Sequence, residues 1–214
     1  LKVLLSIGGW GSGRFSEMAA NDEYRRAFAA DCDRVVKEFA LDGIDIDWEY
    51  PTSSMANISS SPDDTENFTL LMQDIRAAIG NEKELTLATV ASARYIDFKA
   101  ILPSVDFVNI MAYDMASASK HHSALYPSGH SGDITSDGAV TAHLKAGVPP
   151  SKLVMGMPFY GRGGDGYPSF QDYNKVGNTD TQYTEKWDEV AQVPYLADKN
   201  DTLVSVSYTH LRAH

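Results

Sequence analysis

The stretch that decides the fold lies at residues 42–51 and reads Asp42-Gly43-Ile44-Asp45-Ile46-Asp47-Trp48-Glu49-Tyr50-Pro51. Successive side chains of a β-strand point to opposite faces, so Asp45, Asp47 and Glu49 share one face while the other is apolar. Neighbouring buried carboxylates repel one another unless they share protons and hydrogen bonds. Such a row therefore predicts a site at which shifted pKa values serve chemistry.

Glu49 comes last in this strand, where α/β barrels place their catalytic groups. A carboxylic acid beside other carboxylates keeps its proton to higher pH, as a general acid must. Two other interpretations stay open at this point. Carboxylates also bind hard divalent cations, and a strand can carry a solvated polar face.

Five short apolar runs rich in Val, Ile and Leu are typical of buried parallel strands. They are Leu1–Ile7, Gly43–Trp48, Leu85–Val90, Val105–Met111 and Leu153–Phe159. Helical patterns lie between them, at Tyr24–Phe39, Asp63–Ile79, Ile96–Leu102 and Asp137–Ala146. Alternating strands and helices predict right-handed crossovers and a parallel sheet.

The long polar connections all follow strands, whereas the links from helix to strand are short. They are Pro51–Asp63, Met115–Thr135 and Gly163–Tyr183. Loops after strands build the active face of an eight-stranded α/β barrel, and loops of more than about 12 residues are usually functional. An open doubly wound sheet also places its site at the strand ends, so loop lengths leave both folds possible.

Composition and charge narrow the function classes. The chain has 214 residues, of which 43% are apolar and 22% charged, with 29 acidic and 18 basic residues. A formal charge of −11 argues against nucleic acid, which is bound by neutralising phosphates, and is compatible with a neutral sugar polymer. No apolar run reaches the roughly 20 residues of a membrane helix. The single cysteine, Cys32, excludes an intrachain disulfide, and we expect an inert core thiol.

The loop after the fourth apolar run contains His121, His122, His130 and Asp133. Their spacing matches no familiar metal-binding pattern, so we expect solvated loop histidines and no metal or other cofactor.

Four motifs together resemble glycoside hydrolase family 18. The stretch Asp42-x-x-Asp45-x-Asp47-x-Glu49 is similar to the family signature at all four acidic positions. Three more segments resemble its third-, sixth- and seventh-strand motifs: Ser6-Ile7-Gly8-Gly9-Trp10, Met111-Ala112-Tyr113-Asp114 and Gly156-Met157-Pro158-Phe159-Tyr160-Gly161-Arg162. The resemblance implies an α/β fold, a (β/α)8 TIM barrel that is incomplete because only strands three to seven are present.

The resemblance also implies a retaining hydrolysis assisted by the 2-acetamido group of the substrate. Glu49 would protonate the leaving oxygen, Asp47 would orient the acetamido group, and Asp45 would share a proton with Asp47. Tyr113 would donate its hydroxyl to the acetamido carbonyl. The same resemblance assigns the substrate-binding set: Ser6, Gly9, Trp10, Asp42, Met111, Asp114, Tyr160 and Arg162.

The implied substrate is a β-1,4-linked N-acetylglucosamine polymer such as chitin, cut by a monomer outside the cytoplasm. The same carboxylates suit an endo-N-acetylglucosaminidase that cuts N-glycan chitobiose cores. A chitin-binding lectin of this fold is a third alternative, but such proteins commonly lack the acid found here at Glu49.

For the domain organisation we expect a partial barrel domain at residues 1–203 and a non-native tail at 204–214. The tail ends in Ser207–His214, which has neither a helical nor a strand pattern. Because the segment between Arg162 and Trp187 is short, we expect no sizeable insertion after the seventh strand. The chain begins at Leu1 inside a strand-like run, which suggests a cut end.

Overall fold

The computed structural model describes residues 1–116, 120–162, 170–171, 184–197 and 203–205. The chain forms two compact units. The first contains Leu1–Asn109 and His143–Val154, and the second contains Ile110–Ala142 and Met155–His214.

The first unit is built on a five-stranded sheet. Its strands are β1 (Leu4–Gly8), β2 (Gly43–Asp47), β3 (Glu84–Val90), β4 (Phe107–Met111) and β5 (Leu153–Met155), of which β4 and β5 continue into the second unit. They lie in the order β1-β2-β3-β4-β5, and β2 pairs in parallel with both β1 and β3. A doubly wound sheet reverses its strand order, whereas this order never reverses. The structure is therefore a partial (β/α)8 barrel, as the sequence predicted.

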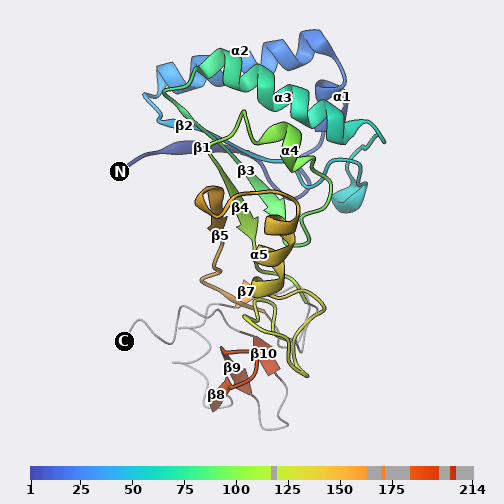
Figure 1. Ribbon diagram of the computed structural model, residues 1–214, viewed down its shortest axis with the longest axis vertical. Helices are drawn as coiled ribbons and strands as arrows, with labels where there is room; N and C mark the ends of the chain where they lie inside the picture. The colour runs from blue at the N-terminus through green and yellow to red at the C-terminus, as the bar shows by residue number, and fades with distance from the viewer. Residues whose placement is uncertain (117–119, 163–169, 172–183, 198–202, 206–214) are drawn as a thin grey trace. The chain divides into compact units, whose positions relative to one another are not determined.

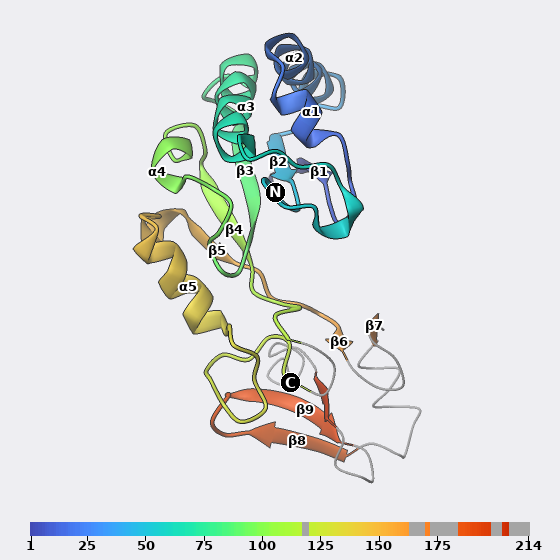
Figure 2. The same cartoon turned by 90° about the vertical axis from the view of Figure 1, so that its right-hand side faces the viewer.

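Helices connect these strands. They are α1 (Phe15–Ala19), α2 (Asp22–Glu38), α3 (Asp64–Ile79), α4 (Phe98–Ile101) and α5 (Ser136–Lys145), with short 3-10 turns at Met55–Asn57 and Pro150–Lys152. The four predicted helices are confirmed, and α1 was not predicted. Figures 1 and 2 show α2 and α3 side by side on one face of the strands β1 to β3.

Local sequence explains where the two long helices begin and end. The Asn21 side chain accepts hydrogen bonds from the backbone N–H groups of Glu23 and Tyr24 and so caps α2. Gly80 ends α3 with a φ of 76°, which glycine adopts without strain. The buried thiol of Cys32 faces the core from α2, and burial raises its pKa to about 12, as expected for an inert cysteine.

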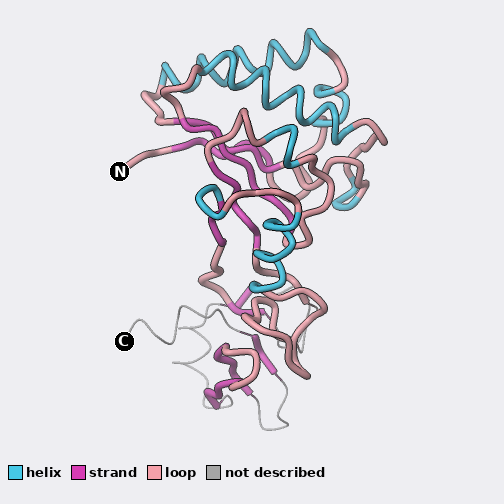
Figure 3. The backbone as a smooth tube through the Cα atoms, viewed as in Figure 1, coloured by secondary structure: helices cyan, strands magenta, loops and turns pink. Residues whose placement is uncertain are grey.

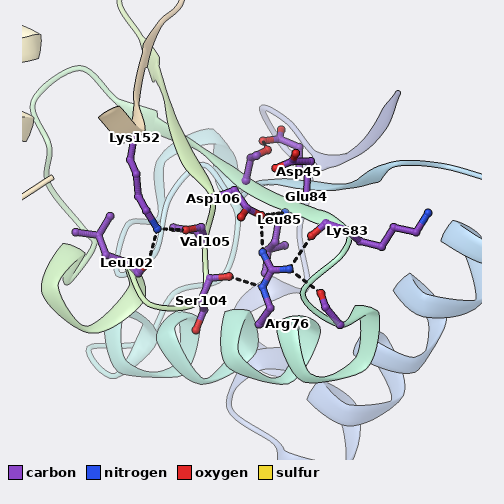
Figure 4. A network of polar contacts seen from close by, with 12 residues as sticks. Asp45, Arg76, Lys83, Glu84, Leu85, Leu102, Ser104, Val105, Asp106 and Lys152 are labelled. Carbon is purple, nitrogen blue, oxygen red and sulfur yellow. Dashed lines mark hydrogen bonds and ion pairs between the residues drawn. The ribbon is translucent and has the colours of Figure 1, made fainter. Parts of the chain in front are cut away.

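The N-terminal ends of β3 and β4 are joined to α3 by a network of polar contacts (Figure 4). The Arg76 guanidinium donates to the backbone oxygens of Ser104, Gly80 and Lys83 and to the carboxylate of Asp106. That carboxylate also accepts the backbone N–H of Leu85 at 2.7 Å. One arginine therefore satisfies groups from two connections at this end of the sheet, the one between α3 and β3 and the one between α4 and β4.

Lys152 makes the corresponding contact just before β5. Its ammonium group donates to the backbone oxygens of Leu102 at 3.0 Å and Val105 at 2.5 Å. The N-terminal ends of barrel strands contribute stability rather than catalysis. The contacts of Arg76 and Lys152 lie at the N-terminal ends of the strands, as expected for residues that contribute to stability.

The second unit contains a second sheet that was not predicted. Its strands are β6 (Gly161–Arg162), β7 (Phe170–Gln171), β8 (Thr184–Asp188), β9 (Val193–Ala197) and β10 (Leu203–Ser205), in the order β7-β6-β10-β9-β8. All four pairings are antiparallel, and the strands are drawn in magenta in Figure 3. The expectation that no sizeable insertion follows the seventh-strand motif stays a prediction. Three of these strands have only two or three residues, β8 is mostly polar and β9 contains a proline, so no strand pattern stood out in the sequence.

Two sequence predictions about boundaries have different outcomes. The predicted strand Leu153–Phe159 ends at Met155, since Pro158 cannot donate to a ladder. Val204 and Ser205, placed in the expected tail, pair with β9. Residues 206–214 lie outside the described residues, so the domain boundary at 203 stays a prediction.

Among the helices described, none is long and apolar enough to cross a membrane.

The Arg76 network predicts a specific loss of stability. In the intact protein, Arg76→Met should lower the free energy of unfolding by about 2 to 3 kcal/mol, because three backbone oxygens and a partly buried carboxylate lose their donor. Urea denaturation measures this. The matched change Arg34→Met removes an exposed arginine whose ion pairs run along α2 and should leave the free energy of unfolding nearly unchanged. Equal losses in the two variants would contradict the assignment.

Candidate active site

The alternation predicted for β2 is confirmed. Ile44, Ile46 and Trp48 are buried, with at most 2% of each side chain exposed, while the carboxylates of the strand face the other way. Trp48 stacks on Phe15 with ring centroids 5.4 Å apart and meets the edge of Phe68. The apolar face thus packs against the helices, and the opposite face is left to the acidic residues.

Asp45 is held by three donors from three neighbouring strands. Ser6 on β1 donates to one carboxylate oxygen at 2.7 Å, while Thr86 on β3 and Asn109 on β4 donate to the other at 2.5 and 3.1 Å. Sequence reasoning identified Ser6 and missed Thr86 and Asn109. Both are polar residues inside apolar strands, and Thr86 pairs directly with Asp45, so strand register could have revealed it.

Asp47 has the opposite environment. Its Oδ1 is buried and has no hydrogen-bond partner among the described residues. Burial, followed by the charges of Glu49 and Asp45, raises the pKa of Asp47 from 3.8 to about 7. Two carboxyl groups of one strand therefore differ in their hydrogen bonding. Asp45 is fully hydrogen-bonded, and Asp47 holds a proton close to neutral pH.

The glycines of the third-strand motif bring β1 against the end of β2. A Cβ atom on Gly8 would lie 1.9 Å from the backbone oxygen of Asp47, so only glycine fits there. The backbone N–H of Gly9 donates to the same oxygen at 2.8 Å. Gly9, expected to bind substrate, thus supports the backbone of Asp47.

Aromatic side chains follow the C-terminal ends of β1, β2 and β3. Trp10 is 60% exposed and meets the edge of the Tyr50 ring, which stacks on Tyr95 with centroids 5.5 Å apart. Burial, and then the charge and hydrogen bond of Glu49, raise the pKa of the Tyr50 hydroxyl above its usual range. The Glu49–Tyr50 peptide bond is cis. Sequence reasoning did not single out Tyr50 or Tyr95.

Asp42 lies apart from the other acidic residues of the signature. It precedes β2, at the end opposite Glu49, and its carboxylate accepts the backbone N–H of Val3 at 2.6 Å. This contact ties the start of β1 to the start of β2. The structure thus gives Asp42 a structural contact, and its expected role in substrate binding stays a prediction.

The second unit brings Asp114, Tyr160 and Arg162 together. Arg162 binds the Asp114 carboxylate in a bidentate manner at 2.6 Å per contact, and the Tyr160 hydroxyl donates to it at 2.9 Å. Burial alone would raise the pKa of Asp114, but hydrogen bonds with His122, Arg162 and Tyr160 hold it well below its usual range. Asp114 is therefore a fixed anion at any ordinary pH.

Tyr113 and Met111 lie at the end of β4 in this unit. The Tyr113 ring meets the edge of Tyr160 at 6.3 Å and passes close to Gly156. A Cβ atom on Gly156 would lie 2.9 Å from that ring and 2.7 Å from the backbone oxygen of Ile110. The glycine of the seventh-strand motif thus makes room for Tyr113, and Met111 is half-buried.

The expectation of solvated loop histidines is wrong for two of the three. His121 and His122 are buried, with 1% and 0% of their surfaces exposed, and only His130 is exposed. The spacing of these histidines in the sequence carries no information about their burial, so the sequence could not predict it. In the part of the chain that the structure describes, no group of three or more His, Cys, Asp or Glu residues could hold a metal ion.

The chain is similar to known chitinases over most of its length. Chitinase A1 of Niallia circulans is 35% identical over 249 residues, covering 92% of this chain and 35% of that protein. Chitotriosidase-1 of Mus musculus is 37% identical over 184 residues, covering 76% of this chain and 39% of that protein. The chain therefore spans less than half the length of these curated relatives.

A solved structure shares the fold closely. A glycoside hydrolase family 18 N-acetylglucosaminidase from Paenibacillus barengoltzii is 35% identical, with a TM-score of 0.87 over 97% of this chain and 70% of that one. The profile of the family described as glycosyl hydrolases family 18 matches residues 1–212. With its acidic row on β2 and its parallel sheet in barrel order, the chain belongs to glycosyl hydrolase family 18.

Proposed function

We propose that the protein hydrolyses β-1,4-linked N-acetylglucosamine polymers, chitin or its oligosaccharides, with retention of configuration and assistance from the substrate. The observation that carries this proposal is the pair of unlike carboxyl groups before Glu49. Both oxygens of Asp45 accept hydrogen bonds, and Asp47 has a buried oxygen with no partner among the described residues. The chitinase names of its relatives support the substrate class.

In the proposed first step, Glu49 protonates the glycosidic oxygen, and the acetamido oxygen of the substrate attacks its own anomeric carbon. The bond to the leaving sugar breaks, and a cyclic oxazolinium ion forms. In the second step, Glu49 removes a proton from water, and the water oxygen adds to the anomeric carbon from the face that the leaving group occupied. The bond between the acetamido oxygen and that carbon breaks at the same time, which opens the ring and restores the neutral acetamido group. Two inversions at this carbon return the β configuration.

Asp47 is proposed to hold the acetamido N–H and to stabilise the positive charge of the oxazolinium ion. A raised pKa suits this task, because the proton can pass to Asp45 as charge develops nearby. Asp45 is kept in one orientation by Ser6, Thr86 and Asn109. These three residues would act by positioning the carboxylates.

The remaining roles are proposed for residues of the second unit and the exposed tryptophan. Tyr113 would donate its hydroxyl to the acetamido carbonyl, and Asp114 with Arg162 and Tyr160 would bind sugar hydroxyls. Trp10 is exposed enough to stack on a sugar ring. Because the substrate class is an external polymer, we place the activity outside the cytoplasm.

Glu49→Gln tests the proposal in the intact protein. The amide cannot transfer a proton, so kcat on N,N′,N″,N‴-tetraacetylchitotetraose should fall by about 10²- to 10⁴-fold while the oligosaccharide still binds. NMR should show that the wild type initially releases β-anomeric products. The matched change Glu82→Gln, at an exposed glutamate, should leave kcat unchanged.

Each other outcome points to one alternative. Binding without cleavage by the wild type would favour a lectin. Neither binding nor cleavage would refute the chitin proposal and make N-glycan chitobiose cores the next substrate to test.

Asp47 predicts an unusual pH dependence of stability. Its pKa rises from 3.8 to about 7 on folding, so between these values the folded state binds more protons than the unfolded state. The free energy of unfolding should therefore fall as pH rises through this window. Asp47→Asn removes the titration and should gain stability relative to the wild type between pH 4 and pH 8, as measured by urea denaturation. A difference in the free energy of unfolding between Asp47→Asn and the wild type that does not change with pH would contradict the prediction.

A further inference from the structure

Asp114 has a backbone conformation that needs support. Its φ of 54° lies in the left-handed region, which residues other than glycine rarely adopt. Such a conformation persists only where surrounding contacts determine it. The first of these contacts is the backbone N–H of Asp114, which donates to Nδ1 of His122 at 3.1 Å.

The same ring nitrogen also faces the side chain of Asp114. Nδ1 of His122 lies 3.3 Å from one carboxylate oxygen, so a proton on Nδ1 would be donated to that oxygen. Without this proton, Nδ1 accepts the backbone N–H instead. Because the Asp114 N–H points at Nδ1, the tautomer with its proton on Nε2 holds the backbone of Asp114 by this hydrogen bond.

His122 is itself immobilised. It is fully buried, and its ring stacks on Tyr160 at 5.3 Å with an interplanar angle of 25°. Its backbone oxygen accepts the N–H of Met115 at 3.0 Å, which draws the two ends of the intervening loop together. Tyr160 in turn donates its hydroxyl to Asp114. The histidine thus contacts both Asp114 and one of its partners.

The neighbouring residue anchors the loop to the β8–β9 hairpin. Nε2 of His121 lies 3.0 Å from the Asp188 carboxylate, which also accepts the hydroxyl of Ser128. The backbone oxygen of Ala191, in the hairpin turn, accepts the N–H groups of Leu125 and Tyr126. His122 therefore lies in a segment that is hydrogen-bonded to the hairpin both before it, at His121, and after it, at Leu125 and Tyr126.

We propose that His122 is a positioning residue that fixes the backbone and carboxylate of Asp114 for substrate binding. The inference rests on the proposed function, in which Asp114 and Arg162 bind sugar hydroxyls. Without His122, Asp114 relaxes out of its left-handed conformation, and its carboxylate leaves the geometry in which Arg162 binds both oxygens. The substrate then loses two oriented polar partners.

Two substitutions separate the hydrogen bond from the packing. His122→Phe keeps a ring to stack on Tyr160 and removes the nitrogen. His122→Asn removes the ring but places an amide oxygen near the position of Nδ1, where it can accept the Asp114 N–H. In the intact protein, His122→Phe should raise KM for the tetrasaccharide about tenfold and leave kcat within about twofold. His122→Asn should recover most of this loss.

The control is His130→Asn, at the exposed histidine of the same loop, which should leave both constants unchanged. A double-mutant cycle tests whether His122 acts through Asp114. In an Asp114→Ala background, His122→Phe should have little further effect on KM. A KM for His122→Phe within twofold of wild type, equal losses for the Phe and Asn variants, or full additivity with Asp114→Ala would each overturn the proposal.

Amide hydrogen exchange in the wild type gives a readout that requires neither activity nor a folded variant. The Asp114 amide should exchange slowly, because a buried acceptor holds its proton. Exchange as fast as that of exposed loop amides would overturn the proposal. If the wild type hydrolyses no chitooligosaccharide but this amide is protected, the proposed function fails while the positioning contact stands.

Discussion

The burial of one face of β2 is the constraint on which the other features of the first unit depend. Ile44, Ile46 and Trp48 are packed against the helices, and each buried side chain of this size contributes about 1.5 to 3 kcal/mol. This offsets the cost of keeping Asp47 in a place where one of its oxygens has no partner among the described residues. Because strand side chains alternate, the same register that buries the apolar residues sets the carboxylates in a row.

Stability and chemistry are divided between the two ends of the same strands. At the N-terminal ends, Arg76 and Lys152 satisfy backbone oxygens, and Asp106 accepts both Arg76 and a strand N–H. At the C-terminal ends, Asp47 is the last residue of β2 and Glu49 follows it, and burial together with the charges of Glu49 and Asp45 raises the pKa of Asp47 to about 7. The residue with the raised pKa therefore lies at the C-terminal end of a sheet whose N-terminal end is held by the hydrogen bonds of Arg76 and Lys152.

In the second unit, buried histidines hold Asp114 and the loop that follows it. Asp114 combines a left-handed backbone with a carboxylate that three side chains bind. His121 fastens the loop through Asp188, and His122 reaches the strained residue directly. The sequence did not predict these contacts: His121 and Asp188, and Asp114 and Arg162, are far apart in the chain, and the burial of His122 has no local pattern.

The sequence by itself determined the alternation of β2, the main helices, the barrel class and the identity of the acidic residues. The strands and helices follow from local periodicity, since a strand repeats every two residues and a helix every 3.6. The barrel class followed instead from the motifs that resemble glycoside hydrolase family 18, because loop lengths left a doubly wound sheet possible. Only the tertiary structure decided that Thr86 and Asn109 hold Asp45, that Asp42 contacts the start of β1, and that His121 and His122 are buried. The second sheet also required the structure. Burial, hydrogen bonding between distant segments and pKa are properties of packing, and packing is set by contacts that no local pattern records.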